Sequence, residues 1–228
     1  MATIYWAGDS TVQYNDITTY PQTGIGQVFH LFLKPEVRVE NHAKNGRSTK
    51  SFIEEARLSP IAERIAEGDF LFIQFGHNDE KKQDPSRYTD PFSEYMLNLE
   101  KFVNTAREKK ALPVLITPLE RRCFVEGDQL GLGEHSDYVA AMKQTAEKLK
   151  VPLIDLYSMS RAELRKAGAK KSKDWYMQLP KGVYPSYMEG LADNTHLRYE
   201  GAVMYAGCIA RGLKELGGRY SDLLVAWE

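Results

Sequence analysis

Short apolar runs alternate in this sequence with longer segments whose apolar residues recur every three or four positions. The runs cover residues 3–6, 37–41, 70–74, 113–116 and 152–155. Such runs are typical of buried strands, and the spacing in 92–108 and 138–150 is typical of amphipathic helices, the second opening near Ser136. Because parallel strands need crossover connections, this alternation predicts a parallel sheet with helices on both faces.

Five strands favour a flavodoxin-like winding, in which a switch in strand order lies beside the first strand. We therefore expect an α/β protein, a three-layer α/β/α sandwich around a five-stranded parallel sheet, forming a single domain over residues 1–228. The charged segment 166–174 is interpreted as a connector, and the aromatic-rich segment 175–187 as part of a long functional loop. Ligands of such folds bind outside the carboxyl ends of the strands, at the switch point.

The composition excludes some function classes. The 228 residues carry a formal net charge of -1, which gives no electrostatic footprint for nucleic acid or an anionic membrane. No stretch approaches the roughly 20 apolar residues of a membrane span. Cys123 and Cys208 form no disulfide framework, and Cys208 is interpreted as a helix core residue. The start MATIYWAGDS lacks a basic and apolar leader, which predicts a cytoplasmic protein, or a secreted one if a signal peptide was removed by cloning.

Glycines and polar residues follow the first three predicted strands, in segments 8–11, 41–52 and 74–79. Ser10 lies at a predicted sharp turn, and far along the chain Asp193 lies three residues before His196, where a helix is expected to begin. A carboxylate that orients an imidazole makes it a general base, and such a base activates a serine hydroxyl. Ser10, Asp193 and His196 are therefore predicted as a catalytic triad.

Acyl transfer also needs donors for the negative charge of a tetrahedral intermediate. The backbone N–H groups of Ser10 and Gly46 and the side-chain amide of Asn78 are predicted to form this oxyanion hole. Gly46 suits the role because glycine lets the backbone approach a substrate oxygen closely. Asp9 is interpreted instead as a carboxylate that braces the turn from beneath.

The four segments with these residues resemble the sequence blocks of the SGNH (GDSL-type) hydrolases. They are Gly8-Asp9-Ser10, Gly46, Gly76-His77-Asn78-Asp79 and Asp193-x-x-His196. Within that family, AGDST, NGRSTKSF, FGHND and DNTHL are similar to the rhamnogalacturonan acetylesterase group of carbohydrate esterases. The resemblance implies the flavodoxin-like fold, no metal or other cofactor, and removal of O-acetyl groups from pectin backbone sugars, with an acetylated oligosaccharide as the partner. The first block reads GDST rather than GDSL, and the secretion signal of many members is absent.

Five further residues are candidates for substrate binding. Arg47 and Arg121 follow the second and fourth predicted strands. A solvated face is the default interpretation of such charges, but they could bind galacturonate carboxylates if the substrate carries them. Trp175 and Tyr187 could stack on sugar rings or pack the long loop. His42 lies close to Gly46 and fits either a pocket rim or a structural position.

Two other histidines are interpreted as unrelated to the chemistry. His30 lies in the apolar segment QVFHLFL, which predicts a satisfied core or boundary side chain. His135 precedes a predicted helix and is expected to be exposed.

Other functions fit parts of this pattern. An acetyl esterase of xylan-type or other small acetylated substrates would use the same triad. A metal-dependent phosphoesterase would draw its ligands from Asp9, His77, Asn78, Asp79 and His196, but dinuclear sites normally need more clustered histidines and carboxylates. A non-catalytic carbohydrate-binding domain would not need the triad. An α/β-hydrolase is disfavoured because Val12 occupies the place of the second glycine in G-x-S-x-G.

Overall fold

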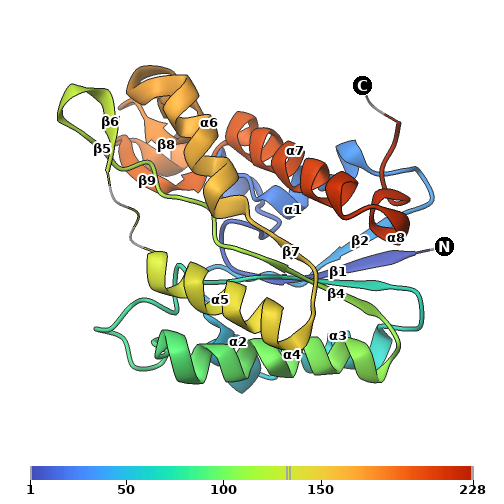
Figure 1. Ribbon diagram of the computed structural model, residues 1–228. Helices are drawn as coiled ribbons and strands as arrows, with labels where there is room; N and C mark the ends of the chain where they lie inside the picture. The colour runs from blue at the N-terminus through green and yellow to red at the C-terminus, as the bar shows by residue number, and fades with distance from the viewer. Residues whose placement is uncertain (1, 132, 134, 227–228) are drawn as a thin grey trace.

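The computed structural model describes residues 2–131, 133 and 135–226, and a parallel sheet forms its middle layer. Five strands pair in the order β2-β1-β3-β4-β7, every neighbouring pair parallel (Figure 1). Their bounds are Thr3–Gly8 for β1, Arg38–Asn41 for β2, Phe70–Gln74 for β3, Leu112–Ile116 for β4 and Leu153–Ile154 for β7. The predicted α/β fold, the flavodoxin-like strand order and all five apolar runs as strands are confirmed.

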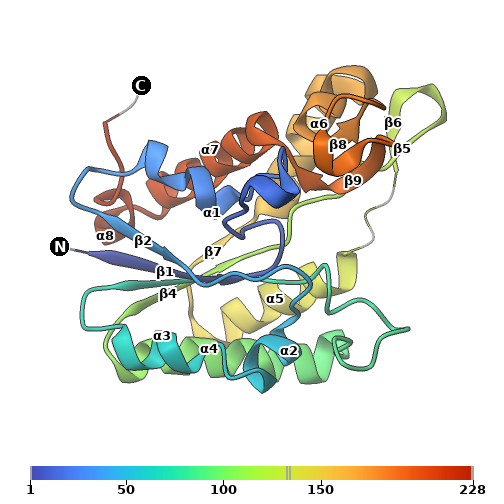
Figure 2. The same ribbon diagram turned by 180° about the vertical axis from the view of Figure 1, so that it is seen from behind.

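Helices cover both faces of this sheet. One layer holds α2 (Thr49–Glu54), α3 (Ser59–Arg64), α4 (Met96–Glu108) and α5 (Ser136–Leu149). The opposite layer holds α1 (Ile25–Val28), α6 (Leu156–Lys171), α7 (Tyr199–Leu216) and α8 (Gly218–Ser221), as both views show (Figures 1 and 2). Single-turn helical segments connect these elements: η1 (Ile17–Thr19), η2 (Phe29–Phe32), η3 (Pro91–Tyr95), η4 (Glu126–Asp128), η5 (Ser172–Trp175) and η6 (Pro185–Tyr187).

Two apolar cores follow from the alternation of side chains along each strand. In β1, Ile4 and Trp6 enter the core beneath α1 and α7, whereas Tyr5 and Ala7 enter the core on the α4 and α5 side. All five residues of β3 are buried, which explains its continuous apolar pattern. Cys208 is buried in α7, as predicted.

The two helices predicted from periodicity are present. The first begins as the π-helical turn η3 and continues as α4, and the second is α5, which begins at Ser136 as expected. The predicted connector 166–174 is wrong, because α6 runs to Lys171 through a kink at Gly168. Gly168 has φ +72°, and a Cβ there would lie 2.9 Å from Asp128 Oδ2, so the side of α6 meets the neighbouring loop at close range.

A small antiparallel hairpin outside the main sheet corrects a second prediction. Strands β8 (Tyr176–Leu179) and β9 (Leu191–Leu197) pair with each other, and a shorter ribbon pairs β5 (Phe124–Val125) with β6 (Gln129–Leu130). Asp193 and His196 therefore lie on a strand rather than at the start of a helix, and α7 begins only at Tyr199. Within the described residues, none of the helices combines the length and apolar character that crossing a bilayer requires.

Candidate active site

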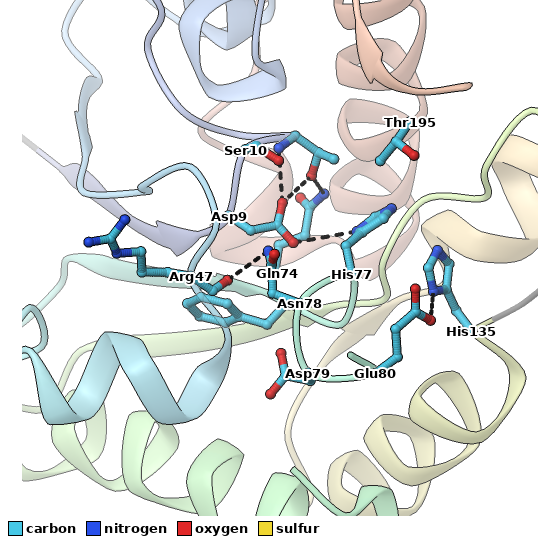
Figure 3. Close-up of polar contacts among 12 residues, drawn as sticks. Asp9, Ser10, Arg47, Gln74, His77, Asn78, Asp79, Glu80, His135 and Thr195 are labelled. Atoms are coloured by element: carbon cyan, nitrogen blue, oxygen red, sulfur yellow. Dashed lines mark hydrogen bonds and ion pairs between the residues drawn. The ribbon is translucent and has the colours of Figure 1, made fainter. Parts of the chain in front are cut away.

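A tight turn at the end of β1 presents Ser10. The backbone N–H groups of Val12 and Gln13 donate to the Asp9 carbonyl at 3.2 and 3.1 Å. The Asp9 carboxylate folds back beneath the turn, where Oδ1 accepts from Thr11 N at 2.9 Å and Thr11 Oγ1 at 2.8 Å (Figure 3). Such Asx geometry is the ordinary local bond of an aspartate in a turn. Asp9 thus braces the turn as expected.

Asp9 is fully buried and stays ionised through its contacts. Burial alone raises its pKa, but the close contact with His77 and the two bonds from Thr11 outweigh this and hold the pKa below its usual value. A buried, negatively charged carboxylate therefore lies beneath the turn beside Ser10 and is hydrogen-bonded to it.

The base approaches Ser10 from strand β9. His196 Nε2 lies 2.9 Å from Ser10 Oγ, and His196 Nδ1 lies 2.6 Å from Asp193 Oδ2. The other Asp193 oxygen accepts from the backbone N–H groups of Thr195 at 2.7 Å and His196 at 2.9 Å, which fixes the carboxylate. The structure brings together the three residues predicted as the triad, although Ser10 and His196 are 186 positions apart in the sequence.

The hydrogen bonds to Asp193 favour its ionised form. Burial raises its pKa, but the bond and charge of His196, with the two backbone donors, lower it to about 2. Asp193 is therefore a carboxylate at neutral pH and can hold the imidazole with its Nε2 lone pair toward the serine hydroxyl. A hydroxyl, an imidazole and a carboxylate in this relation can generate a serine nucleophile.

The predicted oxyanion donors follow β1, β2 and β3, which are adjacent in the sheet. The backbone N–H groups of Ser10 and Gly46 donate to no acceptor within the described residues. Asn78 Nδ2 donates to the Arg47 carbonyl at 3.1 Å, and an amide carries two N–H groups, so the second can serve a ligand (Figure 3). Gly46 has φ +77°, a conformation that glycine adopts without strain.

The loop that carries Gly46 is anchored where it leads into α2. Ser48 and Ser51 form a capping box at the start of α2. Asp79 accepts from Thr49 N at 3.0 Å, from Thr49 Oγ1 at 2.5 Å and from Thr89 Oγ1 at 3.0 Å. Burial raises the pKa of Asp79 to about 7 against these bonds. Asp79 therefore fastens the loop after β3 to the start of α2, a structural contact behind the site.

A chain of buried contacts links the Ser10 turn to strand β9. His77 Nδ1 lies 3.4 Å from Asp9 Oδ2, and the His77 ring packs edge-on against His135, with centroids 4.4 Å apart. His135 Nδ1 lies 2.6 Å from Glu80 Oε2 (Figure 3). The predicted exposure of His135 is wrong, because its side chain is completely buried against these partners.

Arg121 completes this chain of contacts. It donates to Glu80 Oε1 at 2.7 Å and also to Thr195 Oγ1, between Asp193 and His196. Burial raises the pKa of Glu80, but His135 and Arg121 lower it to about 2. The ionised Glu80 carboxylate thus holds a histidine and an arginine between the two halves of the site.

Most of the residues proposed for substrate binding have other partners. Arg47 Nε donates to Glu55 at 2.9 Å and its Nη1 to the Asn45 carbonyl at 2.9 Å. Since Arg121 is held by Glu80 and Thr195, neither guanidinium is the open carboxylate fork that the sequence suggested. His42 Nε2 lies 3.6 Å from Glu40, and burial lowers its pKa, which favours the structural position.

The two aromatic candidates differ. Trp175 is 7% exposed and packs edge-on against Tyr205, so the proposed stacking on a sugar is replaced by a place in the core. Tyr187 is half-buried, and its pKa is raised by burial and by the charge of Asp193, so it lies near that carboxylate. His30 is exposed on η2 rather than in the core.

Sequence reasoning missed one arginine. Arg198 follows β9 directly and lines a cavity of about 890 Å³ with part of the segment that follows Ser10. Its only sequence signal was its place two residues after His196. Within the described residues, no three histidine, cysteine or acidic side chains are grouped in a way that could hold a metal ion.

Comparisons with known proteins cover almost the whole chain. Residues 7–202 match the GDSL-like Lipase/Acylhydrolase family. The chain is 43% identical over 227 residues to rhamnogalacturonan acetylesterase RhgT of Bacillus subtilis. The alignment covers 99% of this chain and 95% of RhgT. It is also 43% identical to the probable rhamnogalacturonan acetylesterase YesY of the same organism, covering 94% of this chain and 93% of YesY.

Solved structures show the same fold. The crystal structure of YxiM from Bacillus subtilis aligns with a TM-score of 0.81 and 26% identity, over 95% of this chain and 57% of that one. The acetylxylan esterase Axe2 of Geobacillus stearothermophilus aligns with a TM-score of 0.64 and 18% identity, over 92% of this chain and 93% of Axe2.

Proposed function

This chain belongs to the GDSL-like lipase/acylhydrolase family, and from that premise we propose that it is a serine esterase that removes O-acetyl groups from rhamnogalacturonan-type saccharides. The observation that carries the proposal is the line of hydrogen bonds from Asp193 through His196 to Ser10, at 2.6 and 2.9 Å. An ester carbonyl beside Ser10 Oγ would meet a nucleophile and its base in hydrogen-bonding range.

The geometry supports a two-step reaction. Ser10 Oγ attacks the acetyl carbonyl carbon while His196 Nε2 takes the hydroxyl proton, and Asp193 stabilises the imidazolium. The tetrahedral intermediate then collapses, the bond to the sugar oxygen breaks, and His196 returns the proton to that oxygen. Water next attacks the acetyl-enzyme with His196 again as base, which releases acetate and restores the Ser10 hydroxyl.

Three donors would stabilise the negative charge of both intermediates. The N–H groups of Ser10 and Gly46 and the second amide N–H of Asn78 have no competing acceptor among the described residues. Loss of one such donor in an oxyanion hole typically lowers kcat by roughly 100- to 1,000-fold.

The substrate class rests on the relatives. Two proteins that are 43% identical over almost the entire chain are named rhamnogalacturonan acetylesterases, one of them as probable. The acetylxylan esterase is 18% identical and supports the fold alone. The xylan-type alternative from the sequence analysis has no relative of comparable identity behind it and ranks second.

Acetate release from acetylated rhamnogalacturonan and xylan oligosaccharides tests the proposal. We expect faster release from the rhamnogalacturonan fragments, and no turnover on either by Ser10→Ala, because the nucleophile is gone. A fluorophosphonate should label Ser10 in the wild type and leave the variant unlabelled, as read by mass spectrometry of peptides. Undiminished turnover by Ser10→Ala would disprove the mechanism. Faster acetate release from the xylan fragments would make acetylated xylan, rather than rhamnogalacturonan, the substrate class.

A further inference from the structure

A cavity of about 890 Å³ is lined by residues that follow Ser10 and His196 closely in the chain. Its walls come from the segment after the Ser10 turn and from the chain on either side of β9, which lie next to each other in Figure 2. The backbone N–H of Thr23 donates to the Leu197 carbonyl at 2.8 Å, which ties these two walls together. The residues that line it include Tyr14, Asp16, Tyr20, Gln22, Arg198, Tyr199 and Glu200.

Two lining residues, Tyr14 and Arg198, are close in the chain to the ester-cleaving groups. Tyr14 follows Ser10 by four residues, and Arg198 follows His196 by two. The backbone at Arg198 is extended, with φ -91° and ψ 175°, so side chains alternate across it. Leu197 points into the core, and Arg198 therefore shares the face of His196, with the two Cα atoms roughly 7 Å apart. A chain of sugars with its acetyl group at Ser10 would extend into this space.

The guanidinium of Arg198 makes no hydrogen bond or ion pair with the residues that the structure describes. Its Nε is buried. Gln22 Nε2, in the same wall, is likewise buried without an acceptor. Buried donors without acceptors cost free energy, which a ligand oxygen recovers on binding. By contrast, Arg122 donates to Ser172 and Asn194.

The remaining walls suit a sugar with a negative charge. Tyr14, Tyr20 and Tyr199 are 66%, 55% and 54% exposed, and aromatic side chains of this kind suit a pyranose ring. Two carboxylates also line the cavity. Asp16 accepts from Thr18 N at 2.9 Å and from Thr18 Oγ1 at 2.5 Å, and Glu200 is exposed. Water screens both, whereas part of the Arg198 guanidinium is desolvated.

We propose that this cavity is a binding subsite for a uronic acid residue of the acetylated saccharide, with its carboxylate on Arg198 and its ring against the tyrosines. The inference rests on the proposed function and deepens it, because it assigns a negatively charged sugar to a defined place beside the scissile ester. A guanidinium presents paired donors that match the two oxygens of a carboxylate.

The test compares one acetylated rhamnogalacturonan oligosaccharide with the same compound after methyl esterification of its carboxyl groups. We expect wild-type kcat/KM to fall roughly 10- to 100-fold on methyl esterification, because a charge-assisted bond is lost. Arg198→Met should lose a similar factor on the free acid, mainly through a higher KM, and should no longer distinguish the two substrates. Arg165→Met removes an exposed arginine of α6 and should keep the wild-type ratio. Fluorophosphonate titration counts the reactive sites in every preparation.

Two outcomes would overturn the subsite. One is an Arg198→Met enzyme that still discriminates between the acid and the methyl ester, and the other is a wild type that never does. If the wild type releases acetate from neither compound, the proposed function fails instead. Calorimetric titration with the deacetylated acid oligosaccharide then decides the subsite separately: binding that Arg198→Met weakens roughly tenfold or more supports it, and equal or absent binding refutes it.

Discussion

For single side chains, the site depends on backbone geometry as much as on chemical groups. Gly46 adopts φ +77°, yet a Cβ added there would meet only Arg87 Nη1 at 3.7 Å. Space is therefore available for a side chain, and the backbone conformation is what requires glycine. Gly218 has φ +51° with no atom within 4 Å of an added Cβ, and it lies in α8, away from the site.

These two glycines make a matched pair of variants. Gly46→Ala and Gly218→Ala should each lower the free energy of unfolding by about 1 kcal/mol, because alanine is strained at positive φ. Gly46→Ala should also lower kcat on p-nitrophenyl acetate by roughly 10- to 100-fold, since relaxation of φ turns an oxyanion donor away. Gly218→Ala should keep the wild-type kcat. Equal kcat values in the two variants would remove Gly46 from the oxyanion hole.

Sequence reasoning found the residues that carry a local pattern and missed those defined by their neighbours. Ser10, Asp193 and His196 stand in short motifs, and the structure brings them into hydrogen-bonding range. Arg47 and Arg198 look alike in sequence, but Glu55 engages one and the other has no partner among the described residues. Ion pairing between distant elements leaves no periodic signal, so only the structure separates them.

Among helices and strands, long periodic segments were predicted well and short irregular ones were not. The π-helical turn η3, which leads into α4, and the kink in α6 at Gly168 disturb a regular helical pattern. Strand β9 was missed because its partner β8 lies across a loop, and cross-strand pairing decides the conformation of such short segments. The placement of Asp193 and His196 on β9 follows from that pairing.

Helix α7 packs closely on the segment before β8. A Cβ at Gly201 would lie 2.1 Å from the Trp175 carbonyl oxygen, which is backbone and cannot move aside easily. A Cβ at Gly207, in the same helix, would meet Phe32 at 3.5 Å, an ordinary contact. The two glycines therefore differ in packing while they share the helix.

Opposite effects on stability follow for these two positions. Gly201→Ala should lower the free energy of unfolding by about 2–3 kcal/mol through overpacking. Gly207→Ala should leave it unchanged or raise it by about 0.5–1 kcal/mol, because alanine is the better helix former. Urea denaturation measures both. A stabilised Gly201→Ala would contradict the close packing of α7 on Trp175.

For the complete chain, apolar periodicity was enough to predict the strand order, because five buried strands with crossover helices allow few windings. It could not predict the buried contacts among His77, His135 and Glu80, which form only where the loop after β3 meets the start of α5. Burial first, and the neighbouring His135 second, lower the pKa of His77 to about 4. The folded protein therefore keeps this imidazole neutral where an unfolded chain would protonate it.

The acid stability of the protein should show this difference. Between pH 6.5 and 4 the unfolded state binds a proton at His77 that the folded state does not, so stability is present above this range and is lost as pH falls through it. We expect the free energy of unfolding of the wild type to fall about 3 kcal/mol more over this interval than that of His77→Gln, which has no titrating group there. Urea denaturation at the two pH values gives the comparison, and parallel losses would contradict a neutral buried His77.

The distance of 186 positions between Ser10 and His196 also governs when a newly made copy becomes active. At roughly 5–20 residues per second, the ribosome adds the imidazole about 10 to 40 seconds after the hydroxyl. On the proposed mechanism, the growing polypeptide until then has a serine without its base and is expected not to cleave esters. On the same mechanism, copies released by stalled translation before His196 is added lack the base and are expected to be inert.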